Sequence, residues 1–322
     1  MAELVVCWLI DMPGARALVL GGISVSRPLR KLAQVILPKS WQARQSQAKL
    51  DAEWLDRCEQ NIQRLMQMLI EGKPSDGIEK YEMSFYSQQG EDGVLLYILS
   101  RIGATNRCFV EFGVGDGREC CTANLALNQG WHGLIMDGGE RNIATAREYY
   151  KARLGEEAQR VKIVQAWITR DNINSLITDA GIGGEIDLLS VDIDGNDYWV
   201  WDAITAINPR VVVAEYNSSF GPERAVTINY QPDFDWKSAH PSRCYHGASL
   251  AALTKLANSK GYMLVGCESK GVNAFFVCRD VGEGKLSEVS VKEAFRPHYE
   301  RLHLGTPDEQ FELIKHMDLV DV

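Results

Sequence analysis

The sequence has no cysteine pattern of the kind that binds a metal ion or builds a disulfide framework. Its eight cysteines are scattered and form no CxxC pair, and Cys120 and Cys121 are adjacent. Adjacent cysteines suit neither a routine disulfide nor a zinc knuckle. We therefore expect reduced thiols and, with them, a cytoplasmic location.

Basic tracts and long apolar runs are missing as well. The net charge of −9 and the pI near 5.3 argue against general binding to nucleic acid or to an anionic membrane surface, because both need a basic face. Residues 1–23 hold two short apolar runs, interrupted by Asp11, Pro13 and Arg16, that are too short to span a bilayer. We expect no transmembrane segment, and we expect residues 1–44 to form a peripheral extension, with a membrane-surface role as the alternative.

The remaining composition is that of an ordinary globular protein without internal repeats. The chain has 322 residues, of which 45% are hydrophobic and 24% charged, enough to bury a large α/β core. Between residues 45 and 71, apolar side chains recur at helical spacing and predict an amphipathic helix. Packing against the rest of the chain is favoured for this helix over a homodimer contact or a substrate lid. The helix and the linker after it make up residues 45–78.

From residue 79 onward, strand patterns alternate with helix patterns. Ser87 is the expected N-cap of a first helix that ends near Ile102. Strands are predicted at 108–112, 133–136, 161–164, 186–191, 211–214, 262–265 and 274–277. Helices are predicted between most of them, at 121–128, 143–154, 173–180, 199–207 and 249–259.

This alternation predicts the fold class. Strongly apolar strands that alternate with helices form a parallel sheet covered on both faces. The last two strands are joined by a short glycine-containing turn without a helix, which predicts an antiparallel hairpin. We expect an α/β, Rossmann-like, doubly wound sheet of seven strands, mostly parallel with an antiparallel final hairpin, in residues 79–284. Residues 285–322 are expected to form a helical cap.

A glycine-rich turn follows the first predicted strand in "FVEFGVGDG". Gly113, Gly115 and Gly117 give a G-x-G-x-G spacing, and Arg118 takes the place of the third glycine of the dinucleotide fingerprint. In that fingerprint, pyrophosphate lies on the N-terminus of the following helix. The fit to a dinucleotide site is therefore imperfect.

Carboxylates gather where the ligand of such a sheet should lie, beyond the carboxyl ends of the strands. They are Glu111, Asp116, Asp137, Asp192, Asp194 and Glu215. A rim of this kind would repel pyrophosphate, whereas S-adenosylmethionine carries a cationic sulfonium and an ammonium group and no phosphate. Its ribose diol needs an acidic acceptor about twenty residues past the glycines, where Asp137 stands. Two structural alternatives remain: Glu111 as a partner of the helix N-terminus and Asp137 as a turn residue before Gly138.

Four segments carry a resemblance to a known family. In order, "FVEFGVGDG", "GLIMDG", "DLLSVDIDGNDYWVW" and "PRVVVAEYNSSFGP" resemble the strand-end motifs of class I S-adenosylmethionine-dependent methyltransferases. The FkbM-like group, often linked to O-methylation of sugars or natural products, is the most similar, because Gly90, Glu91 and Asp92 match its "GED" helix. The resemblance covers roughly residues 83–280.

The resemblance implies a set of cofactor contacts. Glu111 and the three turn glycines would hold the methionine end, Asp137 the ribose, and Asp192 would lie near the methionine or the transfer point. Many relatives place Asp or Asn beside the adenine after the third strand, where this chain has Ala166 and Trp167, so Trp167 is the candidate to stack on the base. The full implied cofactor set is Glu111, Gly113, Gly115, Asp116, Gly117, Asp137, Gly138, Trp167 and Asp192.

The segment "DIDGND" at 192–197 resembles the start of a calcium loop. An EF-hand needs Gly at its sixth position and Glu at its twelfth, but Asp197 and Ala203 stand there. A Mg²⁺ site made from Asp192 or Asp194 with Glu215 or Asn217 is an alternative. The other interpretation, in which these acids cap a helix and bind cofactor or substrate by hydrogen bonds, is at least equal to it, so no metal is assigned.

Methyl transfer needs an aligned, deprotonated nucleophile in a site that excludes water. Residues 217–247 form a long aromatic and polar segment with little periodicity, which is typical of a substrate loop. His240 and His246 within it are candidate general bases, and Asp194 is the rival. The sequence thus predicts methyl transfer to oxygen of a small-molecule or saccharide-type acceptor. The alternatives are an NAD(P)-dependent oxidoreductase and a non-catalytic cofactor-binding module.

Overall fold

The computed structural model describes Gln67 and residues 77–322. The chain divides into two compact units, Met1–Gly72 and Lys73–Val322, and every element named below belongs to the second. The predicted extension at 1–44, and the amphipathic helix with its homodimer role, lie outside the described residues.

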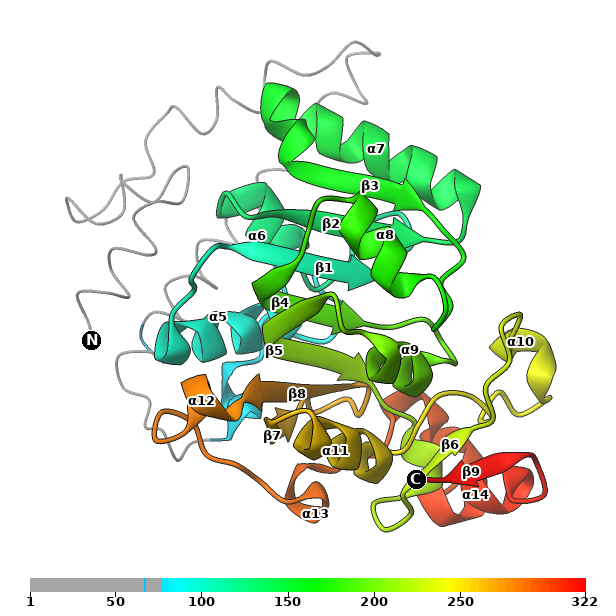
Figure 1. Ribbon diagram of the computed structural model, residues 1–322. Coiled ribbons are helices and arrows are strands. Elements are labelled where there is room, and N and C mark those ends of the chain that lie inside the picture. The colour runs from blue at the N-terminus through cyan, green and yellow to red at the C-terminus, as the bar shows by residue number, and fades with distance from the viewer. Residues whose placement is uncertain (1–66, 68–76) are drawn as a thin grey trace, which may run out of the picture. The chain divides into compact units, whose positions relative to one another are not determined.

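A seven-stranded sheet with the order β3-β2-β1-β4-β5-β8-β7 forms the centre of this unit (Figure 1). The first five strands pair in parallel, whereas β8 pairs antiparallel with both β5 and β7. This confirms the predicted fold class. The strands are β1 (Cys108–Phe112), β2 (His132–Asp137), β3 (Val161–Gln165), β4 (Gly184–Val191), β5 (Ile207–Glu215), β7 (Tyr262–Cys267) and β8 (Asn273–Cys278).

Helices cover both faces of the sheet. In Figure 1, α8, α9 and α11 lie in front of the sheet and α5 and α6 lie behind it, while α7 packs against β2 and β3. The principal helices are α5 (Glu91–Ile102), α6 (Ala123–Asn128), α7 (Glu140–Leu154), α8 (Ile173–Asp179), α9 (Asp197–Ala203) and α11 (Leu250–Ser259). Three short helical segments accompany these helices: η1 (Ile78–Tyr81), η2 (Gly155–Arg160) and α12 (Arg279–Gly282).

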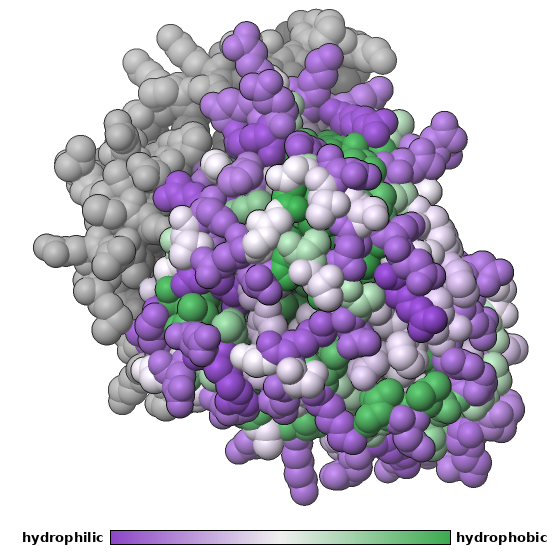
Figure 2. Space-filling model, viewed as in Figure 1, coloured by the Kyte–Doolittle hydropathy of each residue, from purple (hydrophilic) through white to green (hydrophobic). Residues whose placement is uncertain are grey.

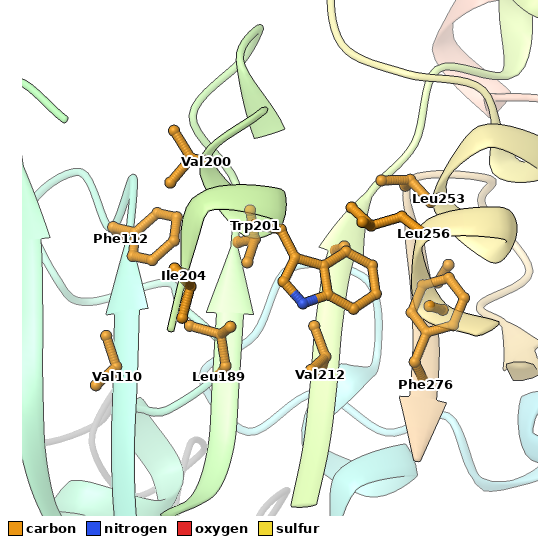
Figure 3. Close-up of a cluster of buried hydrophobic side chains, with 14 of the residues drawn as sticks. Val110, Phe112, Leu189, Val200, Trp201, Ile204, Val212, Leu253, Leu256 and Phe276 are labelled. Carbon is orange, nitrogen blue, oxygen red and sulfur yellow. The ribbon is translucent and has the colours of Figure 1, made fainter. Parts of the chain in front are cut away.

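Side chains from the sheet and its front helices form a continuous core. In Figure 3, the indole of Trp201 on α9 lies between Val212 on β5 and the α11 residues Leu253 and Leu256. Trp201 and Phe276 on β8 have ring centroids 5.2 Å apart. A large aromatic side chain at this point buries apolar surface from three elements at once, and so fixes how α9 and α11 cover the strands that carry the site.

Two predicted helix boundaries are wrong. The helix predicted at 199–207 is α9, which ends at Ala203, and Ile207 is already the first residue of β5. The N-cap of α5 is Gly90 rather than Ser87. Ser87 still serves the helix, because its hydroxyl accepts a hydrogen bond from the Asp92 N–H while Asp92 Oδ2 accepts one from the Ser87 N–H.

The C-terminal segment is not only a helical cap, because it also contributes a strand. Strand β9 (Leu319–Asp321) pairs antiparallel with β6 (Val226–Ile228), which lies inside the predicted substrate loop. A second apolar cluster, including Phe220, Phe234 and Ile314, joins the same two segments. The remaining elements of this region are η3 (Ser218–Phe220), α10 (Trp236–Ala239), α13 (Val291–Ala294), η4 (Tyr299–Leu304) and α14 (Pro307–Ile314).

The visible surface is mainly hydrophilic, with apolar side chains gathered in a few small areas (Figure 2). Among the helices of the described residues, none combines the length and the apolar character needed to cross a membrane.

Candidate functional site

The loop after β1 requires its three glycines for backbone reasons. Gly113, Gly115 and Gly117 all have positive φ, at +79°, +55° and +72°, a region that residues with a Cβ adopt at a cost. A Cβ at position 113 would also overlap the backbone oxygen of Asp192, whereas a Cβ at position 115 would meet nothing within 4 Å. The spacing seen in the sequence therefore lets the loop lie directly against the end of β4.

Glu111 lies on β1 with its carboxylate buried beneath this loop. Its oxygens accept hydrogen bonds from the Cys121 N–H at 2.9 Å, from the Thr122 N–H at 2.9 Å and from the Thr122 hydroxyl at 2.5 Å. Thr122 is the N-cap of α6. These contacts are the ones expected if Glu111 is a partner of the helix N-terminus, which is the structural alternative to cofactor binding. Glu111 also borders the pocket described below.

Asp137 ends β2 and ties two loops together. Its Oδ2 accepts a hydrogen bond from the Gly115 N–H, and its Oδ1 accepts one from the Gly139 N–H and one from the Asn142 amide. Asp137 thus stabilises the turn at Gly139 and also contacts the glycine loop. Its half-buried carboxylate keeps free lone pairs that can accept a hydrogen bond from a further donor.

Trp167 forms a flat surface next to Asp137. A Cβ at Gly138 would stand 3.0 Å from the Trp167 ring, so the absence of a side chain at 138 lets the indole lie over the backbone there. The indole N–H donates to the Pro232 oxygen, yet 58% of the residue remains exposed. A planar ligand group has access to this ring. Asp116, by contrast, lies at the rim and pairs with Arg118 at 3.6 Å, with both side chains substantially exposed.

A pocket opens between the end of β1 and the segment that precedes α5. The described residues that line it include the carboxylates of Glu91, Glu111, Glu119 and Asp192 and no lysine, arginine or histidine. Ser87, Gly113 and Asn273 also line it. Its electrostatics suit a ligand group of positive charge and oppose a phosphate.

Three carboxylates gather at the neighbouring ends of β4 and β5. Asp192, Asp197 and Glu215 each place an oxygen within 4.8 Å of the others, and we call this set the carboxylate trio. Burial, followed by the charges of nearby acids, raises the pKa of Asp192 and of Glu215 well above their usual values. Burial also raises the pKa of Asp197 to about 6, although the Ile193 and Gly195 N–H groups bound to it act in the opposite direction.

The other two members of the alternative metal set lie outside the trio. Asp194 is solvent-exposed with a φ of +57°. Asn217 donates to the Cys244 and His246 oxygens and accepts from Ser219 and Arg301. Its amide is therefore fully committed to holding the loops together.

The two candidate histidines have different surroundings. His246 is 2% exposed, and its Nε2 lies 3.0 Å from Nη2 of Arg301 and 3.9 Å from Glu215. Burial and the Arg301 charge hold the pKa of His246 well below its usual value, so the ring is neutral and its Nε2 accepts from Arg301. His240 bonds to Ser242 and faces His316 at 6.0 Å between ring centroids.

Arg301 and Asp197 are the site residues that the sequence analysis missed. Arg301 lies on η4 in the C-terminal segment and reaches Asn217 and His246, far away in sequence. No local pattern marks it. Asp197 could have been found, because a buried acid in the first turn of a helix after "DIDG" is a plausible acceptor for the preceding backbone N–H groups.

No family model and no curated protein matches this sequence. Solved structures with some similarity include an O-methyltransferase from Bacillus cereus in complex with SAH, at 13% identity over 77% of this chain and 94% of that chain, with a TM-score of 0.38. The N-terminal domain of EvdMO1 with SAH bound is 14% identical over 59% of this chain and 80% of that chain, with a TM-score of 0.37.

A further similar structure is magnesium protoporphyrin IX methyltransferase from Synechocystis PCC 6803 with bound SAM. It is 14% identical over 58% of this chain and 76% of that chain, with a TM-score of 0.37. At these values the similarities are weak, and the fold assignment rests on the strand order and strand directions described above.

Proposed function

We propose that this protein is an S-adenosylmethionine-dependent methyltransferase that transfers a methyl group to an oxygen of a small-molecule or saccharide-type acceptor. The observation that carries the proposal is the pocket beside the glycine loop, whose described lining has four carboxylates and no basic residue. When bound, S-adenosylmethionine supplies a methyl group on a positively charged sulfur. Within the methyltransferases we propose the FkbM-like subgroup, because Gly90, Glu91 and Asp92 match its "GED" segment.

The residues present fit this cofactor. The acidic pocket would hold the ammonium and sulfonium end, Asp137 keeps acceptor capacity for a ribose hydroxyl, and Trp167 offers an exposed ring for the adenine. An NAD(P)-dependent oxidoreductase is disfavoured, because its pyrophosphate would face the same carboxylates.

The acceptor would enter from the side of residues 217–247. In Figure 1, the arrowheads of β1, β4 and β5 point toward the edge on which α10 lies. Asp194 is the candidate base that the structure leaves accessible, since it is exposed and receives a hydrogen bond from Trp236 of that segment. His246 is buried and bonded to Arg301, so we assign it a structural role as a neutral side chain that positions Arg301.

Labelled S-adenosylmethionine tests the proposal when the full chain is incubated with a panel of hydroxylated acceptors, sugars included. We expect label transfer to at least one acceptor, and Asp194→Asn should lower kcat by about 10²-fold or more while SAH affinity is unchanged. Glu185→Gln is the matched control, because Glu185 lies near the start of β4, at the opposite end of the strand from Asp194. This variant should leave methyl transfer intact. Failure of the chain to bind SAH would contradict the proposal, and an Asp194→Asn variant with full activity would exclude Asp194 as the base.

A further inference from the structure

Two members of the carboxylate trio, Asp192 and Glu215, lack the hydrogen-bond donors that normally accompany buried acids. Asp197 accepts hydrogen bonds from the Ile193 N–H at 2.8 Å and the Gly195 N–H at 2.9 Å, one on each oxygen. Asp192 receives no hydrogen bond from any described residue. For Asp192 and Glu215, no hydrogen bond therefore offsets the cost of removing a carboxylate charge from water.

Glu215 is the observation that points to a ligand. It ends β5, whereas Asp192 directly follows β4 and Asp197 begins α9, and it is 8% exposed. Its carboxylate is aimed at the aspartates, with one oxygen within 4.8 Å of an oxygen of each. The nearest basic atom with a described contact is His246 Nε2 at 3.9 Å, which already accepts from Arg301. A nine-tenths buried carboxylate thus has no donor among the described residues.

Arg301 donates no hydrogen bond to the trio in the described part of the chain, although its charge acts to lower the pKa of Glu215. Its Nη1 donates to Asn217 Oδ1 at 2.9 Å and its Nη2 faces His246 Nε2 at 3.0 Å. These two bonds direct both terminal nitrogens to residues outside the trio. A cation placed between the three oxygens would offset the mutual repulsion of the acids.

The spacing and chemistry of the oxygens select the class of ligand. Two oxygens bound to one cation at about 2.1 to 2.4 Å are at most about 4.2 to 4.8 Å apart, the range for Mg²⁺ and Ca²⁺. The trio meets the upper end of that range. Hard carboxylate oxygens, without a described cysteine or neutral imidazole among them, favour Mg²⁺, Mn²⁺ or Ca²⁺ over zinc or copper.

We infer that Asp192, Asp197 and Glu215 bind one divalent cation of the Mg²⁺, Mn²⁺ or Ca²⁺ class at the adjoining ends of β4 and β5. Binding of the cation stands independently of methyl transfer. A cation held there has coordination positions left for oxygens of the acceptor, which favours an acceptor with neighbouring hydroxyl groups; this consequence rests on the proposed function.

Mn²⁺ is the probe for the test, because its free form is counted directly by electron paramagnetic resonance. The full chain, freed of metal by chelation and dialysis, is titrated with MnCl2 in the absence of any cofactor. We expect one site per chain, and displacement of Mn²⁺ by excess Mg²⁺ or Ca²⁺. Glu215→Gln and Asp192→Asn should each weaken binding by roughly tenfold or more, since each removes a charged ligand of similar shape.

Two variants serve as controls. Asp194→Asn changes the exposed acid beside the trio and should weaken Mn²⁺ binding less than the trio variants do, because it removes a nearby charge and no ligand, and Asn tolerates the positive φ at that position. Glu185→Gln, at the opposite end of β4, should bind Mn²⁺ as the wild type does. Circular dichroism of each variant confirms that it is folded, and the two independent ligand variants keep the test valid if one of them is not.

The outcomes separate this inference from the proposed function. A wild-type chain that binds no Mn²⁺, or trio variants that bind it as well as the wild type does, overturns the cation site even if SAH binds. A chain that binds Mn²⁺ through the trio but fails to bind SAH supports the cation site and contradicts the methyltransferase. Equal losses in Asp194→Asn and in the trio variants would also overturn the inference, because they would reveal diffuse attraction to an acidic rim.

Discussion

At the scale of single residues, the acids of this site divide according to the donors that face them. Glu111 and Asp137 accept hydrogen bonds from backbone N–H groups of neighbouring loops, and these bonds hold the glycine loop in place. Glu215 and Asp192 face other carboxylates. The sequence marks all four in the same way, as an acid at a strand end, and only the fold separates those that build the site from those available to a ligand.

Glu111→Gln tests the structural role of the first group. The amide would place an N–H group against the Cys121 or Thr122 N–H, so we expect the free energy of unfolding to fall by about 1 to 3 kcal/mol. Urea denaturation measures this. Glu119→Gln, in the exposed part of the same loop, should change it by less than about 0.5 kcal/mol. Equal effects of the two substitutions would contradict the described role of Glu111.

Gly113→Ala and Gly115→Ala form a second matched pair. Both residues have positive φ, but only at 113 would the new Cβ overlap Asp192. We expect Gly115→Ala to cost about 1 to 2 kcal/mol from backbone strain alone. Gly113→Ala should cost more and should also weaken SAH binding, because the loop must move away from β4. Calorimetric titration with SAH and urea denaturation check both effects, and identical values would show that the close approach is unimportant.

At the scale of elements, local patterns are sufficient where a segment's partners come from its own neighbourhood. The strand at 108–112 is predicted to the residue, and the antiparallel final hairpin is confirmed. The prediction fails where the partner is remote. Strand β9 is three residues long and gains its pairing from β6, while Arg301 gains its role from Asn217 and His246. Neither short segment carries a periodic signal of its own.

Removal of residues 318–322 tests the importance of this remote pairing. The Asn229 N–H donates to the Asp318 oxygen, whereas the Ile228 N–H donates to the Gly247 oxygen, which the truncation leaves in place. In hydrogen exchange, we expect protection at Asn229 to fall by roughly tenfold or more while Ile228 loses less. Unchanged protection at Asn229 would mean that β9 does not stabilise the predicted substrate loop, residues 217–247.

At the scale of the whole molecule, buried acids make stability depend on pH. Burial raises the pKa of Asp92 to about 6 from its usual 3.8, despite three backbone N–H groups that bond to its Oδ2. A raised pKa means that the folded state binds more protons than the unfolded state between these values. The stabilisation from Asp92 is therefore complete below about pH 4 and is lost as the pH rises through about 6.

Asp92→Asn removes this titration. The stability advantage of the wild type over the variant should shrink between about pH 4 and about pH 7, by up to about 3 kcal/mol, because one pKa unit corresponds to about 1.4 kcal/mol. Urea denaturation of both proteins across that range supplies the difference. A difference that stays constant or grows with pH would contradict the raised pKa.

The acidic pocket at the carboxyl edge of the sheet defines the central claim, that this edge holds a positively charged methyl donor. Calorimetric titration of the full chain with S-adenosylmethionine, SAH and NAD measures it most directly. We predict saturable binding of S-adenosylmethionine and SAH, and no binding of NAD. Binding of NAD in place of both sulfur compounds would contradict the account.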